Sequence, residues 1–331
     1  MRRTEVGEKG SSALSYGSAT AVVTGASGFI GRWVARALLA HDAKVVLVVR
    51  NATSALNLGL DDDARCTVMQ ADLMRDNAAR EVIASCRPEI VFNLAGYGVD
   101  RGERDEHVAH AINTELPVRI VEALAEQSDS TWRGQRLVHV GSALEYGEIG
   151  GDLSESCVPN PTTVYGQTKL AGTLAVARTC EKLGVPAITA RLFTVYGEGE
   201  HAQRLLPTLL DATRDEKPIP LSAGDQRRDF TYVEDVAEGI LRLGLNSSGS
   251  CEIVNLATGR LTSVRSFVEV AARTLGISPS RLEFGALPTR AEEMQHDPVS
   301  VEKLRAMAGW VPSTSLHEGI ARAVHRFSGS F

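Results

Sequence analysis

The sequence lacks the features that mark several classes of protein. Its apolar runs all fall short of the roughly 20 residues that a membrane-spanning helix needs. Its five cysteines stand far apart with no C-x-x-C pair, which argues against a zinc site and against a disulfide framework. The net charge of -6 gives no support for bulk binding to nucleic acid. We therefore expect a cytoplasmic protein with reduced cysteines, no metal, no nucleic-acid partner and no membrane partner.

Length and composition predict a large folded core. With 331 residues, of which 43% are hydrophobic and 23% charged, the chain is long enough for two unequal lobes. Residues 1–18 are polar, rich in glycine and serine, and lack the apolar core of a signal peptide. We expect them to form a flexible leader.

A strand, a glycine-rich turn and a helix follow one another in residues 21–39. The small and β-branched residues 21–24 predict a buried strand of a parallel sheet, and apolar residues at helical spacing follow the turn. Between them stand Gly25, Gly28 and Gly31, which permit unusual backbone angles and let a pyrophosphate approach the main chain. The free N–H groups at the start of the helix would face those phosphates. The pattern indicates a dinucleotide site, with a simple tight turn as the alternative.

The glycine spacing G-x-x-G-x-x-G, written TGASGFIG here, resembles that of the extended short-chain dehydrogenases. The resemblance implies an α/β fold: a doubly wound parallel Rossmann sheet with helices on both faces, which binds its cofactor beyond the carboxyl ends of the strands. It also implies that several apolar side chains lie against the cofactor, namely Phe29, Ile30, Leu94 and Leu192.

The end of the second expected strand, residues 43–49, bears on the choice of cofactor. An acidic residue there would hold both ribose hydroxyls of NAD and repel a 2′-phosphate, whereas an arginine does the opposite. This chain has Arg50 at that place, with Arg32 just after the last glycine as a possible helper. The sequence therefore favours NADP(H), with a solvated arginine at a strand end as the alternative.

Three further segments match the family in its cofactor region. In the family an Asp-Leu pair after the third strand contacts the adenine, which assigns that role to Asp72 and Leu73, although Asp72 could equally cap a helix. Small residues after the fourth strand, Ala95 and Gly96, would let the dinucleotide cross the strand ends. The helix around Asn113 resembles one whose asparagine supports the active-site lysine through its backbone and a water.

A serine at the end of a strand and a Y-x-x-x-K pair form the expected catalytic group. Tyr165 and Lys169 stand four residues apart, on one face of a helix, and Ser142 follows the strand 137–140. A free tyrosine has a pKa of about 10 and exchanges protons poorly near neutrality, but a nearby ammonium favours its phenolate. Tyr165 is then the general acid in reduction and the base in oxidation. Ser142 would hydrogen-bond the same substrate oxygen, and Lys169 would also hold the nicotinamide ribose.

Later segments narrow the resemblance to the nucleotide-sugar branch of the family. The stretches 186–200, 224–237 and 309–312, which include RRDFTYVEDVA, carry this likeness. It implies that Arg228 and Arg290 hold the diphosphate of the substrate through their planar donor groups, although either could be a surface ion-pair partner. Thr194 stands where many relatives have an asparagine that contacts the substrate phosphate.

The two residues after Ser142 bear on the reaction. Sugar-nucleotide dehydratases and decarboxylases carry acidic residues there, but this chain has Ala143 and Leu144, which transfer no proton. Glu145 is one position too far along, so an extended backbone would point it to the other face. The run GSALEYG resembles that of 4-keto-6-deoxyhexose reductases.

We therefore expect NADPH-dependent reduction of the C4 ketone of a dTDP- or GDP-linked 4-keto-6-deoxyhexose. A nucleotide-sugar 4-epimerase is the alternative. A cofactor-binding sensor without activity and a dehydrogenase of steroid or flavonoid ketones are less favoured.

The resemblance also implies a division of the chain. An NADP-binding domain is expected in residues 19–194 plus 231–259, with the strand 252–255 returning to the main sheet, and a smaller mixed lobe for the nucleotide sugar in residues 195–230 plus 260–331. Family members commonly form homodimers through a four-helix bundle made by the helices of Asn113 and Tyr165. Val118, Val121 and Leu124 fit such an interface, or they pack inward.

Overall fold

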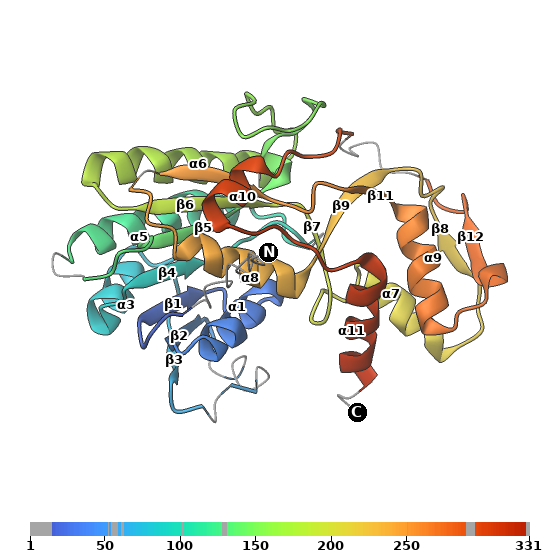
Figure 1. Ribbon diagram of the computed structural model, residues 1–331, viewed down its shortest axis with the longest axis horizontal. Helices are drawn as coiled ribbons and strands as arrows, with labels where there is room; N and C mark the ends of the chain where they lie inside the picture. The colour runs from blue at the N-terminus through green and yellow to red at the C-terminus, as the bar shows by residue number, and fades with distance from the viewer. Residues whose placement is uncertain are drawn as a thin grey trace, which may run out of the picture.

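The structure is a computed structural model (Figure 1). It describes residues 15–328 except 52, 54–58, 61–62, 101, 128–130, 250 and 289–294. Arg290, expected to bind a diphosphate, therefore lies outside the described residues, as does most of the expected leader. No helix in the described ranges is long and apolar enough to cross a membrane.

A seven-stranded sheet forms the centre of the larger part of the molecule, and all of its pairings are parallel. This confirms the expected doubly wound α/β fold. The strand order is β10-β6-β5-β4-β1-β2-β3. The strands are β1 (Thr20–Thr24), β2 (Lys44–Val49), β3 (Cys66–Gln70), β4 (Ile90–Asn93), β5 (Leu137–Ser142), β6 (Ala187–Leu192) and β10 (Glu252–Leu256).

Helices cover both faces of this sheet, so its central strands are buried on both sides. Val22 of β1 packs into one apolar cluster and Val23 into the other, as the alternation of side chains along a strand requires. On one face α1 (Phe29–Ala40) packs against α8 (Val233–Gly244). The other face carries α3 (Ala78–Cys86), α5 (Leu116–Ala125) and α6 (Val164–Leu183).

The strand order reverses its direction of growth between β1 and β4. The chain builds β2 and β3 on one side of β1 and then β4, β5 and β6 on the other. Such a switch point opens a crevice beyond the carboxyl ends of the two central strands. The glycine turn after β1 and the small residues after β4 both lie at that crevice.

A smaller lobe extends to the right of the sheet in Figure 1. It holds a three-stranded sheet in the order β11-β9-β7 and a parallel pair of β8 with β12. The strand β10, which follows α8, pairs with β6 in the main sheet, as expected. The elements are β7 (Thr194–Tyr196), α7 (Leu205–Asp211), β8 (Ile219–Leu221), β9 (Arg227–Tyr232), β11 (Leu261–Ser263), α9 (Val264–Leu275), β12 (Leu282–Phe284) and α11 (Leu316–Ser328).

Two features differ from the expected domain limits. Tyr16, expected in a flexible leader through residue 18, is 2% exposed; its ring stacks on Trp132 and its hydroxyl donates to the Leu241 carbonyl at 2.7 Å. Helix α10 (Glu302–Ala308), expected in the smaller lobe, packs against β10 and α8 of the larger one. The other domain limits stay predictions.

The expected dimer face is partly used within the chain. Val121 and Leu124 of α5 are 0% and 1% exposed, so these two pack inward.

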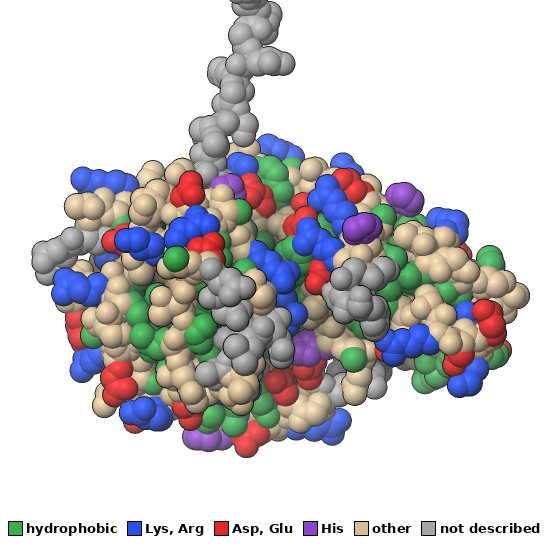
Figure 2. Space-filling view, turned by 90° about the horizontal axis from the view of Figure 1, so that it is seen from below, with side chains coloured by type: hydrophobic (Ala, Val, Ile, Leu, Met, Phe, Trp, Pro, Cys, Tyr) green, Lys and Arg blue, Asp and Glu red, His purple; other side chains and the backbone are tan. Residues whose placement is uncertain are grey.

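The face of the molecule that is seen from below in Figure 2 shows acidic and basic side chains interspersed.

Gly31 tests how tightly α1 packs on the turn. A Cβ at this position would lie 2.2 Å from the Gly25 carbonyl oxygen and 2.9 Å from the Ala26 Cα, both main-chain atoms. We expect Gly31→Ala to lower the free energy of unfolding by about 1–3 kcal/mol, as overpacking does. Urea denaturation would measure this. Gly102→Ala is the matched control, since its Cβ would meet no atom within 4 Å; equal stability of the two variants would contradict the packing argument.

Candidate active site

A cavity of about 1030 Å³ lies beyond the carboxyl ends of the parallel strands. The glycine turn borders it at one end and β9 of the smaller lobe at the other. Its wall includes these expected site residues: Gly25, Gly28, Phe29, Ile30, Gly31, Arg50, Asp72, Leu73, Leu94, Ala95, Gly96, Ser142, Tyr165, Lys169, Leu192, Thr194 and Arg228. The sequence predictions thus converge on one place, although the role of each residue stays a prediction.

The glycine turn has the shape that a dinucleotide requires. Gly25 has a φ of +64°, and a Cβ there would lie 2.7 Å from the Leu94 carbonyl carbon, so only glycine allows this approach between the turn and the end of β4. Gly28 precedes the first residue of α1, and its lack of a side chain leaves the first N–H groups of the helix without a side-chain cap. These donors and the positive end of the helix dipole fit a pyrophosphate.

The ends of β2 and β3 carry the next expected cofactor residues. Arg50 is exposed on the cavity wall, and its carbonyl accepts a hydrogen bond from the Gln70 side chain at 3.1 Å. Asp72 also lines the cavity, and its carboxylate accepts from the Met74 amide at 3.1 Å, so it stabilises the local turn as well. The position of Arg32 differs from the expectation that this residue helps Arg50 at the cofactor.

The Arg32 side chain folds back onto the glycine turn. Its guanidinium donates to the carbonyls of Gly28 and Ser27, each at 3.3 Å, and Arg32 is not part of the described cavity wall. These hydrogen bonds occupy the N–H groups of Arg32 that were expected to help Arg50 at the cofactor. Arg50 is therefore the better placed of the two arginines for a 2′-phosphate.

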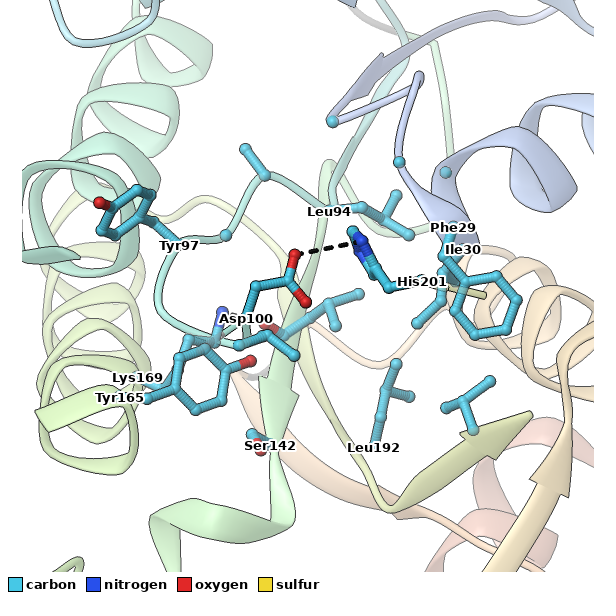
Figure 3. Close-up of a pocket in the computed structure, with 18 of the residues that line it drawn as sticks. Phe29, Ile30, Leu94, Tyr97, Asp100, Ser142, Tyr165, Lys169, Leu192 and His201 are labelled. Carbon is cyan, nitrogen blue, oxygen red and sulfur yellow. Dashed lines mark hydrogen bonds and ion pairs between the residues drawn. The ribbon is translucent and has the colours of Figure 1, made fainter. Parts of the chain in front are cut away.

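Ser142, Tyr165 and Lys169 come together on one side of the cavity (Figure 3). Ser142 is the last residue of β5, and its hydroxyl accepts a hydrogen bond from the Leu144 amide at 3.2 Å. Tyr165 and Lys169 project from successive turns of α6, whose first turn is capped by Thr163. The ammonium of Lys169 is 3% exposed and donates to the Val140 carbonyl.

Burial shifts the proton affinities of this pair in opposite directions. Desolvation raises the pKa of Tyr165 to about 12; the charge of Glu145 adds to the rise, while a hydrogen bond with Ser142 and the charge of Arg204 oppose it. Desolvation lowers the pKa of Lys169 to about 8, against the opposing effect of Glu145. With no cofactor bound, Tyr165 therefore holds its proton firmly, and the expected lowering of its pKa by the Lys169 ammonium is not seen.

Asn113 lies behind the wall of the cavity, next to the helix that carries Tyr165 and Lys169. It lies in a π-helical turn, Ala111–Glu115, and is fully buried. Its side chain accepts from the Tyr97 amide at 3.0 Å, and donates to the Tyr97 carbonyl at 2.8 Å and to the Thr168 hydroxyl at 3.0 Å. The amide group thus joins the loop after β4 to α6 beside Lys169. Its expected contribution through the backbone and a water stays a prediction.

The smaller lobe forms one end of the cavity, where the substrate was expected. Thr194 begins β7 and Arg228 lies in the neighbouring strand β9, where its side chain is half-buried. Asp229 beside it is buried and accepts hydrogen bonds from Thr258 and from the Arg260 amide. This buried carboxylate holds the strand that presents Arg228 to the cavity.

Sequence reasoning missed a set of charged residues at this end. A side-chain contact of 3.1 Å between Asp100 Oδ2 and His201 Nδ1 crosses the cavity (Figure 3). Glu103, Glu200 and Arg204 line it as well, and burial raises the pKa of Glu200 to about 7. These side chains stand on loops far apart in sequence and belong to no recognisable spacing. Only the fold could bring them together.

The side chain of Glu145 is not on the wall of the cavity, which agrees with the expected direction but has a different reason. Residues Ala143–Glu145 form a short 3-10 turn rather than extended chain. This turn directs the carboxylate back onto the Ser142 amide, at 2.8 Å, and onto Arg191 of β6. The residue is fully buried outside the described cavity wall.

Comparison with known proteins agrees with this geometry. The model of the NAD dependent epimerase/dehydratase family matches residues 21–257. A relative from Kitasatospora kifunensis, dTDP-6-deoxy-L-talose 4-dehydrogenase (NAD(P)(+)), is 30% identical over 318 residues, or 91% of this chain and 93% of the relative. UDP-glucose 4-epimerase from Mycolicibacterium smegmatis is 28% identical over 327 residues, or 92% of this chain and 97% of the relative.

Solved structures extend the similarity to the fold. The structure of MoeE5 in complex with UDP-glucuronic acid and NAD has a TM-score of 0.80 at 26% identity, covering 94% of this chain and 100% of that one. The match therefore runs through both lobes and includes the strand–turn–helix unit and the Tyr-Lys helix. On its sequence and its fold, the chain belongs to the NAD dependent epimerase/dehydratase family.

Proposed function

We propose that this chain reduces the C4 ketone of a nucleotide-activated 4-keto-6-deoxyhexose, dTDP- or GDP-linked, with NADPH. The observation that carries the proposal is the meeting of Ser142, Tyr165 and Lys169 in one cavity where Ala143 and Leu144 supply no second acid or base. The buried Glu145 is bound to Arg191 and so is also withheld from the substrate. The similarity to dTDP-6-deoxy-L-talose 4-dehydrogenase (NAD(P)(+)) supports the same type of reaction.

The residues of the cavity suit the parts of the cofactor in turn. The start of α1 and the glycine turn would hold the pyrophosphate, Asp72 the adenine side, Arg50 a 2′-phosphate and Lys169 the nicotinamide ribose. The bound cofactor supplies the hydride that is added to C4. The proposal of NADPH rather than NADH is supported by the exposed position of Arg50 on the wall.

The proton chemistry belongs to the side chains of the chain itself. As C4 gains a hydride, negative charge grows on the former ketone oxygen, which Ser142 orients through a hydrogen bond. Tyr165 donates its phenolic proton to that oxygen, so the alkoxide becomes an alcohol and a phenolate remains. The ammonium of Lys169 stabilises the phenolate until solvent restores its proton. Arg228 would hold the diphosphate and so fix the position of the sugar.

A nucleotide-sugar 4-epimerase is the second candidate. Relatives named UDP-glucose 4-epimerase and dTDP-L-rhamnose 4-epimerase support it. An epimerase would oxidise and reduce the same sugar on a retained cofactor, so it would consume no NADPH. A sensor would bind cofactor without any turnover.

We also infer a homodimer in which α5 and α6 pair with their copies in a four-helix bundle. Leu174 of α6 is 39% exposed, which supports an apolar contact on one face of this helix.

The reaction is tested by incubating dTDP- and GDP-4-keto-6-deoxyhexoses with NADPH and solving the products by NMR. We expect NADPH oxidation matched by formation of the 4-hydroxy sugar. Tyr165→Phe should reduce kcat by about 10²–10⁴-fold, the contribution of a general acid, while its affinity for NADPH is retained. Interconversion of two sugar nucleotides without NADPH consumption would overturn the reductase proposal in favour of an epimerase.

The proposed preference for NADPH over NADH is tested separately with Arg50→Asp. Losing a charged donor to the 2′-phosphate and adding a repulsive carboxylate should reduce the preference for NADPH over NADH by about 10–100-fold. Ratios of kcat/KM for the two cofactors measure this. Arg214→Asp is the control, since this exposed arginine lies in the smaller lobe and pairs with Asp211. An unchanged ratio in Arg50→Asp would show that Arg50 does not select the cofactor.

A substitution at Lys169 tests whether the buried ammonium lowers the free energy of unfolding. The pKa of Lys169 is about 8 in the folded protein, which is below the ordinary value. Below pH 8 the lysine is charged in both states, and because the charge is less favourable in the folded state it lowers the free energy of unfolding. Between about pH 8 and 10 the folded state alone loses that proton, and the cost disappears. We expect Lys169→Met to lose reductase activity yet gain stability relative to the wild-type apoprotein at pH 7, with the gain shrinking by pH 10. A constant difference in urea denaturation across this range would contradict it.

A further inference from the structure

Glu145 and Arg191 form a buried ion pair directly behind the catalytic group. The Glu145 side chain is 0% exposed and the Arg191 side chain 2% exposed. One carboxylate oxygen accepts from the Ser142 amide at 2.8 Å, and the other accepts from the Arg191 Nε at 2.9 Å. The carboxylate therefore ties the last residue of β5 to the next strand, β6.

A row of residues across the carboxyl edge of the sheet holds this pair. Gly141, Arg191 and Asn255 are register partners on the adjacent strands β5, β6 and β10. The guanidinium of Arg191 lies 4.5 Å from the centre of the Tyr146 ring, and the Tyr146 hydroxyl donates to Asn255 at 2.8 Å. Gly141 leaves the space that the carboxylate fills, because a Cβ there would lie 2.6 Å from Glu145 Oε1.

The arrangement does more than join two strands. Taking two charges out of water is expensive, and apolar side chains of similar size usually stabilise such a place as well or better. Stability alone therefore gives no reason for a carboxylate here. The position of the Glu145 carboxylate gives a reason, because its charge acts on both members of the catalytic pair. It raises the pKa of Tyr165 and that of Lys169.

Other charged groups also face this pair. Arg204, from the loop before α7, lowers the pKa of Tyr165, and Glu103, from the loop before α4 (Glu106–His110), raises it. His139 of β5 lies near Lys169, and burial together with the lysine charge holds its pKa well below the ordinary value. His139 is therefore neutral in the working range of pH. Glu145 is the anion that acts on both Tyr165 and Lys169.

We propose that Glu145, held by Arg191, is a positioning residue for the reduction: it fixes Ser142 at the end of β5 and places its carboxylate behind the Tyr165–Lys169 pair. This inference rests on the proposed function, since it assigns Tyr165 as the proton donor. The charge keeps the ammonium of Lys169 protonated in a site whose burial disfavours it. Lys169 is then charged when the phenolate forms.

The direct test is the titration of Lys169 in the full-length apoprotein. Glu145→Gln keeps an oxygen that can accept from the Ser142 amide but removes the charge. We expect the Lys169 pKa to fall from about 8 by about one pH unit, because the ammonium loses a stabilising anion. NMR of lysine labelled with ¹³C at Cε measures this, with Lys169→Met identifying the resonance. Glu148→Gln is the matched control, an exposed glutamate three residues further along.

Kinetics give the second readout. With the ketone substrate, Glu145→Gln should move the basic limb of the kcat profile about one pH unit lower, so that kcat falls by about twofold at pH 7 and by nearly tenfold above pH 8, with KM for the sugar little changed. The double variant Glu145→Met/Arg191→Met removes both charges and fills the space with apolar groups. It should fold with a melting temperature near that of the wild type and still show the lowered Lys169 pKa and kcat.

The outcomes separate the inference from the function on which it rests. An unchanged Lys169 titration in folded Glu145→Gln, or a double variant with the kcat of the wild type, would overturn the role of Glu145. If the wild type reduces no ketone, the proposed function fails, but the NMR titration still decides whether Glu145 sets the charge of Lys169.

Discussion

The common direction of the seven strands is the constraint on which the rest of this molecule depends. Because every strand of the main sheet is parallel, all of their carboxyl ends meet at one edge. The glycine turn, the expected cofactor contacts after β2, β3 and β4, and Ser142 of β5 therefore face one cavity although they are spread over more than a hundred residues. The crossover helices bury both faces of the sheet, which leaves this edge as the place where polar chemistry can occur.

Electrostatics at that edge follow from burial rather than from surface charge. Lys169, Glu145 and Arg191 are all nearly inaccessible, and each is held by a specific partner: a main-chain carbonyl, a main-chain amide or the opposite charge. Such groups are costly to bury without a partner, although Nη1 of Arg191 is buried with no hydrogen-bond partner among the described residues. The cost is offset by packing of the sheet and its two apolar clusters. As a result, the pKa of Tyr165 is raised and the pKa of Lys169 is lowered.

Much of the site could be predicted because it consists of local patterns. The turn from Gly25 to Gly31 combines a strand, glycines and a helix within a dozen residues, and the spacing of Tyr165 and Lys169 is set by one turn of helix. Features that depend on distant partners could not be predicted. Tyr16 is ordered because Trp132 and Leu241 meet it, and Arg32 turns back because the carbonyls of its own turn attract it. The contact between Asp100 and His201 joins two loops about a hundred residues apart.

The sequence by itself determined the order of strands and helices, the glycine turn and the pairing of Tyr165 with Lys169, because apolar periodicity and glycine conformation act over a few residues. Only the tertiary structure decided where the carboxylate of Glu145 lies. A 3-10 turn directs it onto the Ser142 amide and onto Arg191, which lies on a strand adjacent in space but 46 residues away in sequence. Side-chain direction at the end of a strand depends on such partners, which no local pattern contains.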